Sequence, residues 1–166
     1  LNYGSKIINE LNGIFSIIYI DLKNNNIECI RDFTGTKPLY YSFHNNNFFF
    51  SSEAWFLYSL SQKKLNIKSF NFFLNYGFSP EENTLIENVK KVMPRSILKV
   101  NFNTAESSSN EYFKLDEKKN SNLINYNSIN NLLENSVKMN LLSDTKIGTF
   151  LSGGVDSSLV TAIAKK

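Results

Sequence analysis

The sequence predicts an α+β fold that continues into the first elements of an α/β fold. Between residues 14 and 102, short apolar runs alternate with polar, Asn-rich turns, a pattern typical of the hairpins of an antiparallel sheet. Residues 146–166, KIGTFLSGGVDSSLVTAIAKK, predict a strand over the apolar run 147–151, then a glycine turn and a helix. The composition changes between these parts, so we predict domains over 1–103 and 122–166, joined by a linker over 104–121.

Helix and turn signals define the first elements. Residues 3–11 should form the end of a helix, with Ile7, Ile8 and Leu11 on one face. The Asn12–Gly13 pair terminates this helix. Two hairpins follow, each with an Asn-rich turn, and their predicted strands are 14–21 with 27–31 and 38–43 with 48–52.

The middle of the chain returns to strands before the pattern becomes helical. A short helix over 54–60 should contact the sheet through Trp55, Phe56 and Tyr58. The next predicted elements are a helix over 69–76 that is ended by Gly77, and a polar loop over 79–84. Two strands at the margin of the sheet, 89–93 and 96–102, and a polar connection over 104–110 follow. A long helix is predicted over about 122–143 by apolar residues at a spacing near 3.6. These residues are Leu123, Ile129, Leu132, Leu133, Val137 and Leu141.

Composition bounds the class of protein. Of the 166 residues, 42% are hydrophobic, which is enough to bury a core. A net charge of +3 without a long run of Lys or Arg gives no support to nucleic-acid binding. No apolar stretch reaches the roughly 18 residues of a membrane span, and the N-terminus lacks a signal-peptide layout, so we expect a cytoplasmic protein. The single cysteine, Cys29, excludes an intrachain disulfide, and its apolar strand favours a buried structural thiol over a nucleophile.

The stretch around Gly153 and Gly154 carries the clearest chemical signal. Adjacent glycines let the backbone turn sharply and approach a ligand without a Cβ in the way. The following helix would begin with amide groups that have no acceptor, and its dipole favours negative charge there, so a phosphate would bind. The alternative is a helix that begins after a Gly-rich turn, is capped by Ser152 or Asp156, and carries no ligand.

The full string SGGVDSS resembles the pyrophosphate loop of the N-type ATP pyrophosphatases, which adenylate a carboxylate or similar acceptor and release pyrophosphate. It differs from the kinase and GTPase loop because no Lys follows the glycines within the turn. Five segments together resemble glutamine-dependent asparagine synthetase over nearly the whole chain. They are LNGIFS at 11–16, RDFTGTKPLYY at 31–41, FFFSSE at 48–53, FLNYGF at 73–78 and FLSGGVDSS at 150–158.

This resemblance implies a fold and a set of site residues. Residues 1–103 would be the later part of an N-terminal-nucleophile glutaminase sheet of class II. Residues 122–166 would be the first helix, strand, loop and helix of a parallel-sheet ATP pyrophosphatase domain. The implied ATP-binding residues are Leu151, Ser152, Gly153, Gly154, Asp156 and Ser157. Among them Asp156 would shape the loop or support the Mg²⁺ that accompanies ATP, and Leu151 would place its backbone beside the nucleotide.

The resemblance also implies a reaction. A glutamine-hydrolysing asparagine synthetase converts aspartate, glutamine and ATP to asparagine, glutamate, AMP and pyrophosphate through an adenylated aspartate, and the full-length parent would form a homodimer. Two alternatives stay open. One is an amidotransferase of the same architecture with a β-lactam, sugar or peptide acceptor. The other is a truncated product that catalyses nothing.

The chain departs from the family pattern at several positions. Thr34 and Thr36 stand where an aromatic and an aliphatic residue are usual, and Lys146 stands where Pro is common. The family's nucleophilic cysteine and glutamine-binding residues would precede Leu1. Its remaining ATP, aspartate and catalytic positions would follow Lys166. We therefore expect an internal fragment and assign no catalytic residue.

Residues of the earlier segments have structural roles in this interpretation. We expect Arg31, Asp32, Lys37 and Pro38 to stabilise a strand-turn at a domain interface, with a direct part in ammonia passage as the alternative. His44 precedes three asparagines and is expected in a surface turn. Glu53 follows two serines and is expected to be a helix cap or an interdomain contact.

The 166-residue chain alone should release no ammonia from glutamine and form no amide from aspartate and ATP. The reason is that the nucleophile and most of the substrate pockets would lie outside it. Ammonia release by the purified chain, measured against a boiled sample, checks this. Release above that control would contradict the expectation and direct the search for a nucleophile to Cys29.

Overall fold

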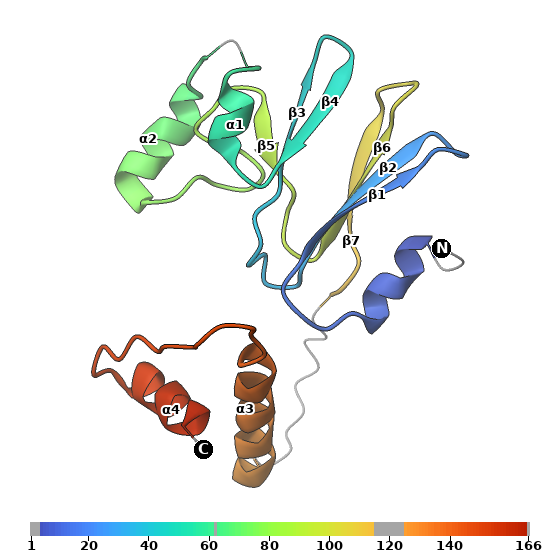
Figure 1. The fold of residues 1–166 in the computed structure, drawn as a ribbon. Coiled ribbons are helices and arrows are strands. Elements are labelled where there is room, and N and C mark those ends of the chain that lie inside the picture. The colour runs from blue at the N-terminus through green and yellow to red at the C-terminus, as the bar shows by residue number, and fades with distance from the viewer. Residues whose placement is uncertain (1–3, 62, 115–124, 166) are drawn as a thin grey trace. The chain divides into compact units, whose positions relative to one another are not determined.

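A computed structural model describes residues 4–61, 63–114 and 125–165 (Figure 1). Two compact units form, comprising residues 1–116 and 117–166. Within the described residues, every strand belongs to the first unit. None of the helices in these ranges is both long and apolar enough to cross a membrane.

The first unit contains two antiparallel sheets. In chain order the elements are η1 (Gly4–Glu10), β1 (Ser16–Asp21), β2 (Asn26–Arg31), β3 (Tyr40–His44), β4 (Asn47–Ser51), α1 (Ala54–Tyr58), α2 (Ile67–Tyr76), β5 (Val89–Lys91), β6 (Ser96–Asn101) and β7 (Ser107–Glu111). The larger sheet has the strand order β1-β2-β6-β7, and the smaller sheet has the order β4-β3-β5. The predicted hairpins, the helix ended by Gly77 and the antiparallel sheet are therefore confirmed.

Asparagines form the tight turns of both hairpins. Between β3 and β4, Asn45 and Asn46 have φ values of 49° and 59° and connect the paired residues His44 and Asn47. Two residues with positive φ form the turn that matches the twist of a hairpin, and Asn tolerates this conformation. In the β1–β2 turn, the Asp21 carboxylate accepts hydrogen bonds from the backbone N–H groups of Lys23 and Asn24. The Asn-rich runs are thus turn-forming residues.

The core of the first unit is formed by side chains from both sheets and their connections. Its buried members are Cys29, Leu39, Val92, Leu98 and Val100, and Ile27, Tyr41, Phe48 and Phe50 pack against them. Burial raises the pKa of the Cys29 thiol to about 12. The prediction of a buried structural thiol is confirmed, because a thiol of this kind is rarely a thiolate near neutral pH.

A buried carboxylate closes the turn that follows β2. Asp32 is 1% exposed. Its Oδ1 accepts the N–H of Thr36 at 2.9 Å and the hydroxyl of Thr34 at 3.1 Å, and its Oδ2 accepts the N–H of Lys37 at 2.9 Å. Burial raises the pKa of this carboxyl, but the hydrogen bonds together lower it by more, so the pKa lies below its ordinary value of 3.8.

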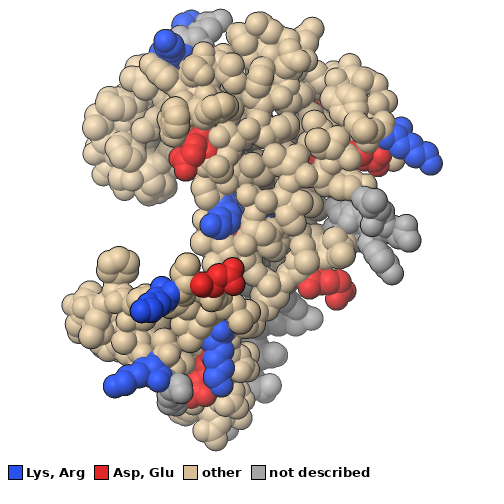
Figure 2. All heavy atoms as spheres, in the orientation of Figure 1, with Lys and Arg blue, Asp and Glu red and all other residues tan. Residues whose placement is uncertain are grey.

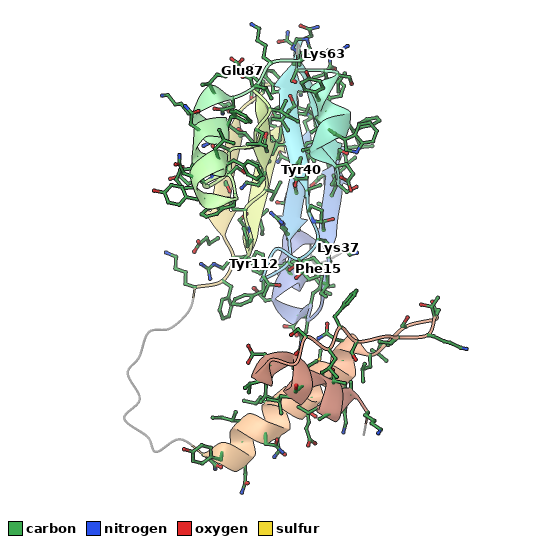
Figure 3. The ribbon with its side chains drawn as sticks, turned by 90° about the vertical axis from the view of Figure 1, so that its left-hand side faces the viewer. Phe15, Lys37, Tyr40, Lys63, Glu87 and Tyr112 are labelled. Carbon is green, nitrogen blue, oxygen red and sulfur yellow. The ribbon has the colours of Figure 1, made fainter. Side chains whose placement is uncertain are left out.

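Arg31, the last residue of β2, fastens the same turn from the other side. Its Nε donates to the carbonyl of Lys37 at 2.8 Å, and its two terminal nitrogens donate to the carbonyls of Gly35 at 2.6 Å and Val92 at 2.7 Å. Tyr112 donates its hydroxyl to the carbonyl of Arg31 at 2.9 Å. Figure 3 shows Lys37 and Tyr112 at this end of the sheets. The predicted stabilisation of a strand-turn by Arg31 and Asp32 is confirmed, whereas their place at a domain interface stays a prediction.

Gly35 is required within this turn. Its φ is +68°, a conformation that side-chain-bearing residues rarely adopt. A Cβ at this position would also lie 2.7 Å from Pro94 Cγ and 3.2 Å from Arg31 Cζ. The turn therefore closes only with a glycine at this position.

Two predictions about helices of the first unit need correction. In α1 the buried residue is Leu57, whereas Trp55 and Phe56 are 71% and 58% exposed and Tyr58 is also exposed. A helix of this length presents only about one residue to the sheet, and an unbroken apolar run does not show which one. The predicted apolar face at 7–11 is also wrong, because Ile8 is buried while Ile7 and Leu11 are exposed.

The strands at 96–111 also differ from the prediction. β6 lies inside the larger sheet, between β2 and β7, and not at its margin. β7 begins within the stretch 104–110 that was predicted as a connection and ends at Glu111, and it pairs with β6. All of its side chains are exposed. An edge strand open to water on both faces needs no apolar alternation, so its composition is that of a loop.

The described part of the second unit contains two helices that contact each other, α3 (Tyr126–Asn140) and α4 (Val155–Ala164). The predicted helix over 122–143 is confirmed for α3, which is capped by the Asn125 side chain, and Leu123 lies outside the described residues. The strand predicted at 147–151 is not formed, and Phe150 is 100% exposed. A strand exists only when paired, and the described residues of this unit provide no neighbouring strand.

Replacement of Asp32 by Ala should lower the free energy of unfolding by roughly 2–6 kcal/mol. The N–H groups of Thr36 and Lys37 lose their acceptor, the buried Asp32 carboxylate, and each such loss costs about 1–3 kcal/mol. Denaturant unfolding of the two proteins measures the difference. Asp21→Ala is the matched control, because Asp21 accepts similar backbone bonds in an exposed turn. Equal losses in both variants would contradict the role assigned to burial.

The stability contributed by Asp32 should also depend on pH. Its folded-state pKa is lowered, so this contribution is complete above the unfolded value near 3.8 and is lost as the pH falls through the folded pKa. Acid unfolding of Asp32→Asn should therefore lack this part of the pH dependence. An acid-unfolding slope identical to that of the unmodified chain would show that another carboxyl is responsible.

Candidate functional site

The glycine loop leads directly into α4. Gly153 has φ +81°, in the left-handed region that glycine adopts without strain. Gly154 has φ −75° and ψ 162° and is the N-cap residue of the helix. Leu151, Ser152 and both glycines are exposed. The chain thus turns sharply at Gly153, and the helix begins one residue after Gly154.

Two hydroxyl groups lie over this turn. Ser152 Oγ and Ser157 Oγ are 3.0 Å apart, and Ser157 Oγ donates to the carbonyl of Gly154 at 3.1 Å. Since Ser157 donates its proton to the main chain, Ser152 must be the donor in the hydroxyl pair. The two side chains are five positions apart in the sequence and are brought together by the turn at Gly153.

Main-chain donors lie at the same end of the helix. The first intrahelical bond at the N-cap runs from the Ser158 N–H to the Gly154 carbonyl at 3.1 Å. Helix geometry therefore leaves the N–H groups of Val155, Asp156 and Ser157 without an intrahelical acceptor. Together with the helix dipole, these groups favour an anion.

The helix cap from Ser152 or Asp156, which belonged to the alternative without a ligand, is not formed. The N-cap is Gly154, which makes no side-chain cap bond, and Asp156 already lies in the first turn. The left-handed Gly153 moves the start of the helix past Ser152, whose oxygen is bonded to Ser157 instead. The amides at this end of α4 are therefore uncapped by side chains, which a ligand-binding loop requires.

The α-carbon of Gly154 faces the two hydroxyls. A Cβ built on it would lie 3.6 Å from Ser152 Oγ and 4.0 Å from Ser157 Oγ, which is ordinary contact. The fold would accept a side chain at Gly154, but that side chain would occupy the space beside both hydroxyls. At Gly153 the positive φ requires glycine for the backbone itself.

The other singled-out residues do not form a second site. His44 ends β3 beside the Asn45–Asn46 turn, close to its predicted place. Glu53 is the N-cap residue of α1 but makes no side-chain cap bond. Over residues 4–61, 63–114 and 125–165, no three His, Cys, Asp or Glu side chains gather as a metal site. Figure 2 shows the Lys and Arg side chains of the first unit standing apart on the visible face.

Sequence reasoning missed the function of Thr34 and Thr36. Their hydroxyl oxygens lie 2.8 Å apart, and Thr34 donates to the buried Asp32. These threonines are therefore part of the hydrogen-bonded turn, although they depart from the family pattern. The available signal was two hydroxyl residues within four positions of an Asp in a turn.

Comparison with known proteins covers both units. Residues 1–113 match the family model of the glutamine amidotransferase domain, and residues 128–166 match that of asparagine synthase. The "Putative asparagine synthetase [glutamine-hydrolyzing] 2" of Methanocaldococcus jannaschii is 32% identical over 98% of this chain and 33% of the relative. "Asparagine synthetase [glutamine-hydrolyzing] 1" of Bacillus subtilis is 29% identical over 99% of this chain and 26% of the relative.

A third relative comes from a virus. The "Probable asparagine synthetase [glutamine-hydrolyzing]" of Acanthamoeba polyphaga mimivirus is 28% identical over 96% of this chain and 28% of the relative. The chain thus spans between about a quarter and a third of the length of these relatives. Since the amidotransferase model alone matches more than half of the chain, and the asparagine synthase model matches its end, the chain belongs to the family of glutamine amidotransferase domains.

Proposed function

We propose that this chain is part of an enzyme that makes asparagine from aspartate, with glutamine as the nitrogen donor and ATP as the activating substrate. Glutamine hydrolysis supplies ammonia and glutamate, and adenylation of aspartate releases pyrophosphate. Ammonia then attacks the adenylated carboxyl and AMP leaves. The observation that carries the proposal is the exposed loop at 152–157, with its uncapped amides and paired hydroxyls, in a chain whose relatives are named asparagine synthetases.

Adenylation explains why such an enzyme needs a phosphate loop. A carboxylate is a poor electrophile, so the reaction first needs AMP as a leaving group on the aspartate. Charge builds on the departing pyrophosphate, and donors fixed in advance stabilise that charge better than water does. In our proposal the donors are the amides that follow Gly154 and the hydroxyls of Ser152 and Ser157. The main chain of Leu151 lies beside the nucleotide.

The residues at the loop fit an ATP-bound Mg²⁺ only through a single carboxylate. Mg²⁺ is usually held by one or two carboxylates together with phosphate oxygens and water. Asp156 is exposed in the first turn of α4 and is the acid that the loop provides. We propose that it supports the ion that accompanies ATP. The ion itself would neutralise phosphate charge.

The first unit has a supporting role in this proposal. Asp32 is buried and saturated with hydrogen bonds, and Arg31 is bound to three carbonyls, so neither is available for proton transfer. We propose that they fix the end of a glutaminase sheet. The domain limits of 1–103 and 122–166 remain part of the proposal, as do a cytoplasmic location and a homodimeric parent. β7 extends the sheet of the first domain into residues 107–111.

Two variants of the loop test the proposal in a protein that carries this chain together with the segments its relatives add. Ser157→Ala removes one charge-assisted hydrogen bond, worth roughly 1.5–3 kcal/mol or about 10- to 150-fold in pyrophosphate release. Gly154→Val should cost more, because its side chain fills the space beside Ser152 and Ser157. Glutamate release should persist in both variants. Parallel assays of glutamate and pyrophosphate supply the measurement.

Matched controls separate binding from folding. Gly148→Val is one, because Gly148 also has ordinary φ and no atom within 4 Å of a built Cβ, but lies before the loop. Ser158→Ala is the other, since Ser158 is exposed beside Ser157 on α4. Both should keep pyrophosphate release. Equal loss of both activities in the loop variants would indicate misfolding, and undiminished pyrophosphate release would remove the phosphate-loop assignment.

A further inference from the structure

The connection between η1 and β1 contains a reactive dipeptide that the proposed function does not use. Asn12 is the only asparagine of the chain that is followed by glycine. Both Asn12 and Gly13 are exposed, just after η1 ends at Glu10 and before β1 begins at Ser16. A Cβ built on Gly13 would meet no atom within 4 Å. We propose that Asn12 is a site of spontaneous deamidation, with Gly13 as the attacking residue.

The reaction needs only water as a co-reactant. The backbone nitrogen of Gly13 loses its proton and attacks the side-chain carbonyl carbon of Asn12. The new C–N bond closes a five-membered imide as the side-chain nitrogen leaves as ammonia. Water then adds to one of the two imide carbonyls. Opening at one carbonyl gives an ordinary aspartate residue with a normal backbone, and opening at the other gives an isoaspartyl link that routes the backbone through the former side chain.

Access of the attacking nitrogen distinguishes Asn12 from the asparagines of α3 and of the β3–β4 turn. The attack needs the backbone to rotate until the nitrogen reaches the side-chain carbonyl, and a Cβ on the following residue hinders this approach. Asn127 and Asn135 precede serines inside α3, where helical hydrogen bonds fix the backbone. Asn45 precedes Asn46 in the two-residue turn of the β3–β4 hairpin. Asn12 instead has a glycine neighbour and lies outside the helices and strands.

The structural consequence would fall on η1. Ile8, four residues before Asn12, lies in η1 and is buried. The normal aspartate product changes only a charge on an exposed side chain. The isoaspartyl product lengthens the backbone between Ile8 and β1 by one carbon atom, so the register between the buried side chain and the strand is disturbed. The two products should therefore differ in how firmly η1 is held.

The test follows the 166-residue chain during incubation at neutral and mildly alkaline pH. Peptide mass spectrometry compares the peptide containing Asn12 with those containing Asn45, Asn127 and Asn135 in the same samples. The Asn12 peptide should lose its amide first and separate into two isomers, faster at the higher pH because the attacking nitrogen must lose a proton. Asn12→Gln should abolish this early product, since Gln would have to close a larger ring.

Two further samples decide the result. Gly13→Ala should slow the loss of the Asn12 side-chain amide several-fold. A denatured sample of the chain gives the deamidation rate of Asn12 in the absence of folded structure. If Asn12 keeps its amide in the folded chain while the denatured chain loses it, the structure protects this residue and the proposal is overturned. It is also overturned if Asn45 reacts before Asn12. Protection of η1 amides from hydrogen exchange should fall in the isoaspartyl product and persist in an Asn12→Asp variant.

Discussion

The hydrogen-bonded turn made by Arg31 and Asp32 is the constraint on which the first unit depends. Arg31 donates to the carbonyls of Gly35 and Lys37 within the β2–β3 connection and to the carbonyl of Val92, which directly follows β5. The Asp32 carbonyl accepts the N–H groups of Gly35 and Arg95, the second of which directly precedes β6. One turn therefore holds the chain where it leaves the larger sheet, enters the smaller one and returns. Most hydrogen-bond partners of Arg31 and Asp32 are backbone groups, so these two residues fix the path of the main chain.

The charges of Asp32 and Arg31 are tolerated in this turn because both side chains have hydrogen-bond partners. A buried carboxylate without donors would be costly, but Asp32 has donors on both oxygens. The guanidinium of Arg31 has carbonyl acceptors on all three of its nitrogens. Bonds within residues 31–37 close the turn locally, and its long-range bonds position distant segments. The long-range partners are Phe15, Val92, Arg95 and Tyr112. These bonds give the turn a structural function without requiring a catalytic one.

The two units differ in how much they bury. The first has a core shared between two sheets, whereas Ile163 is the buried apolar residue of the described part of the second. The loop at 152–157 nevertheless has a defined geometry, because Gly153, the N-cap at Gly154 and the paired serines are local features. Local backbone geometry is enough to leave the first amides of α4 without a side-chain cap. It is not enough to pair the apolar run at 147–151, which needs neighbouring strands.

Sequence alone determined the features whose cause is local. Hairpins followed from Asn-rich turns between apolar runs, and Gly77 ended α2 because it adopts the left-handed conformation there. The glycine loop and its helix followed from the order of Ser152, Gly153, Gly154 and Val155. Tertiary structure decided what depends on partners. In α1 the buried residue is Leu57 and not Trp55. Ser107–Glu111 forms a strand because it pairs with β6. The Thr34 hydroxyl donates a hydrogen bond to the buried Asp32 carboxylate. Residues 147–151 stay unpaired for the same physical reason: side-chain burial and strand pairing are set by neighbours in space, which a pattern along the chain does not contain.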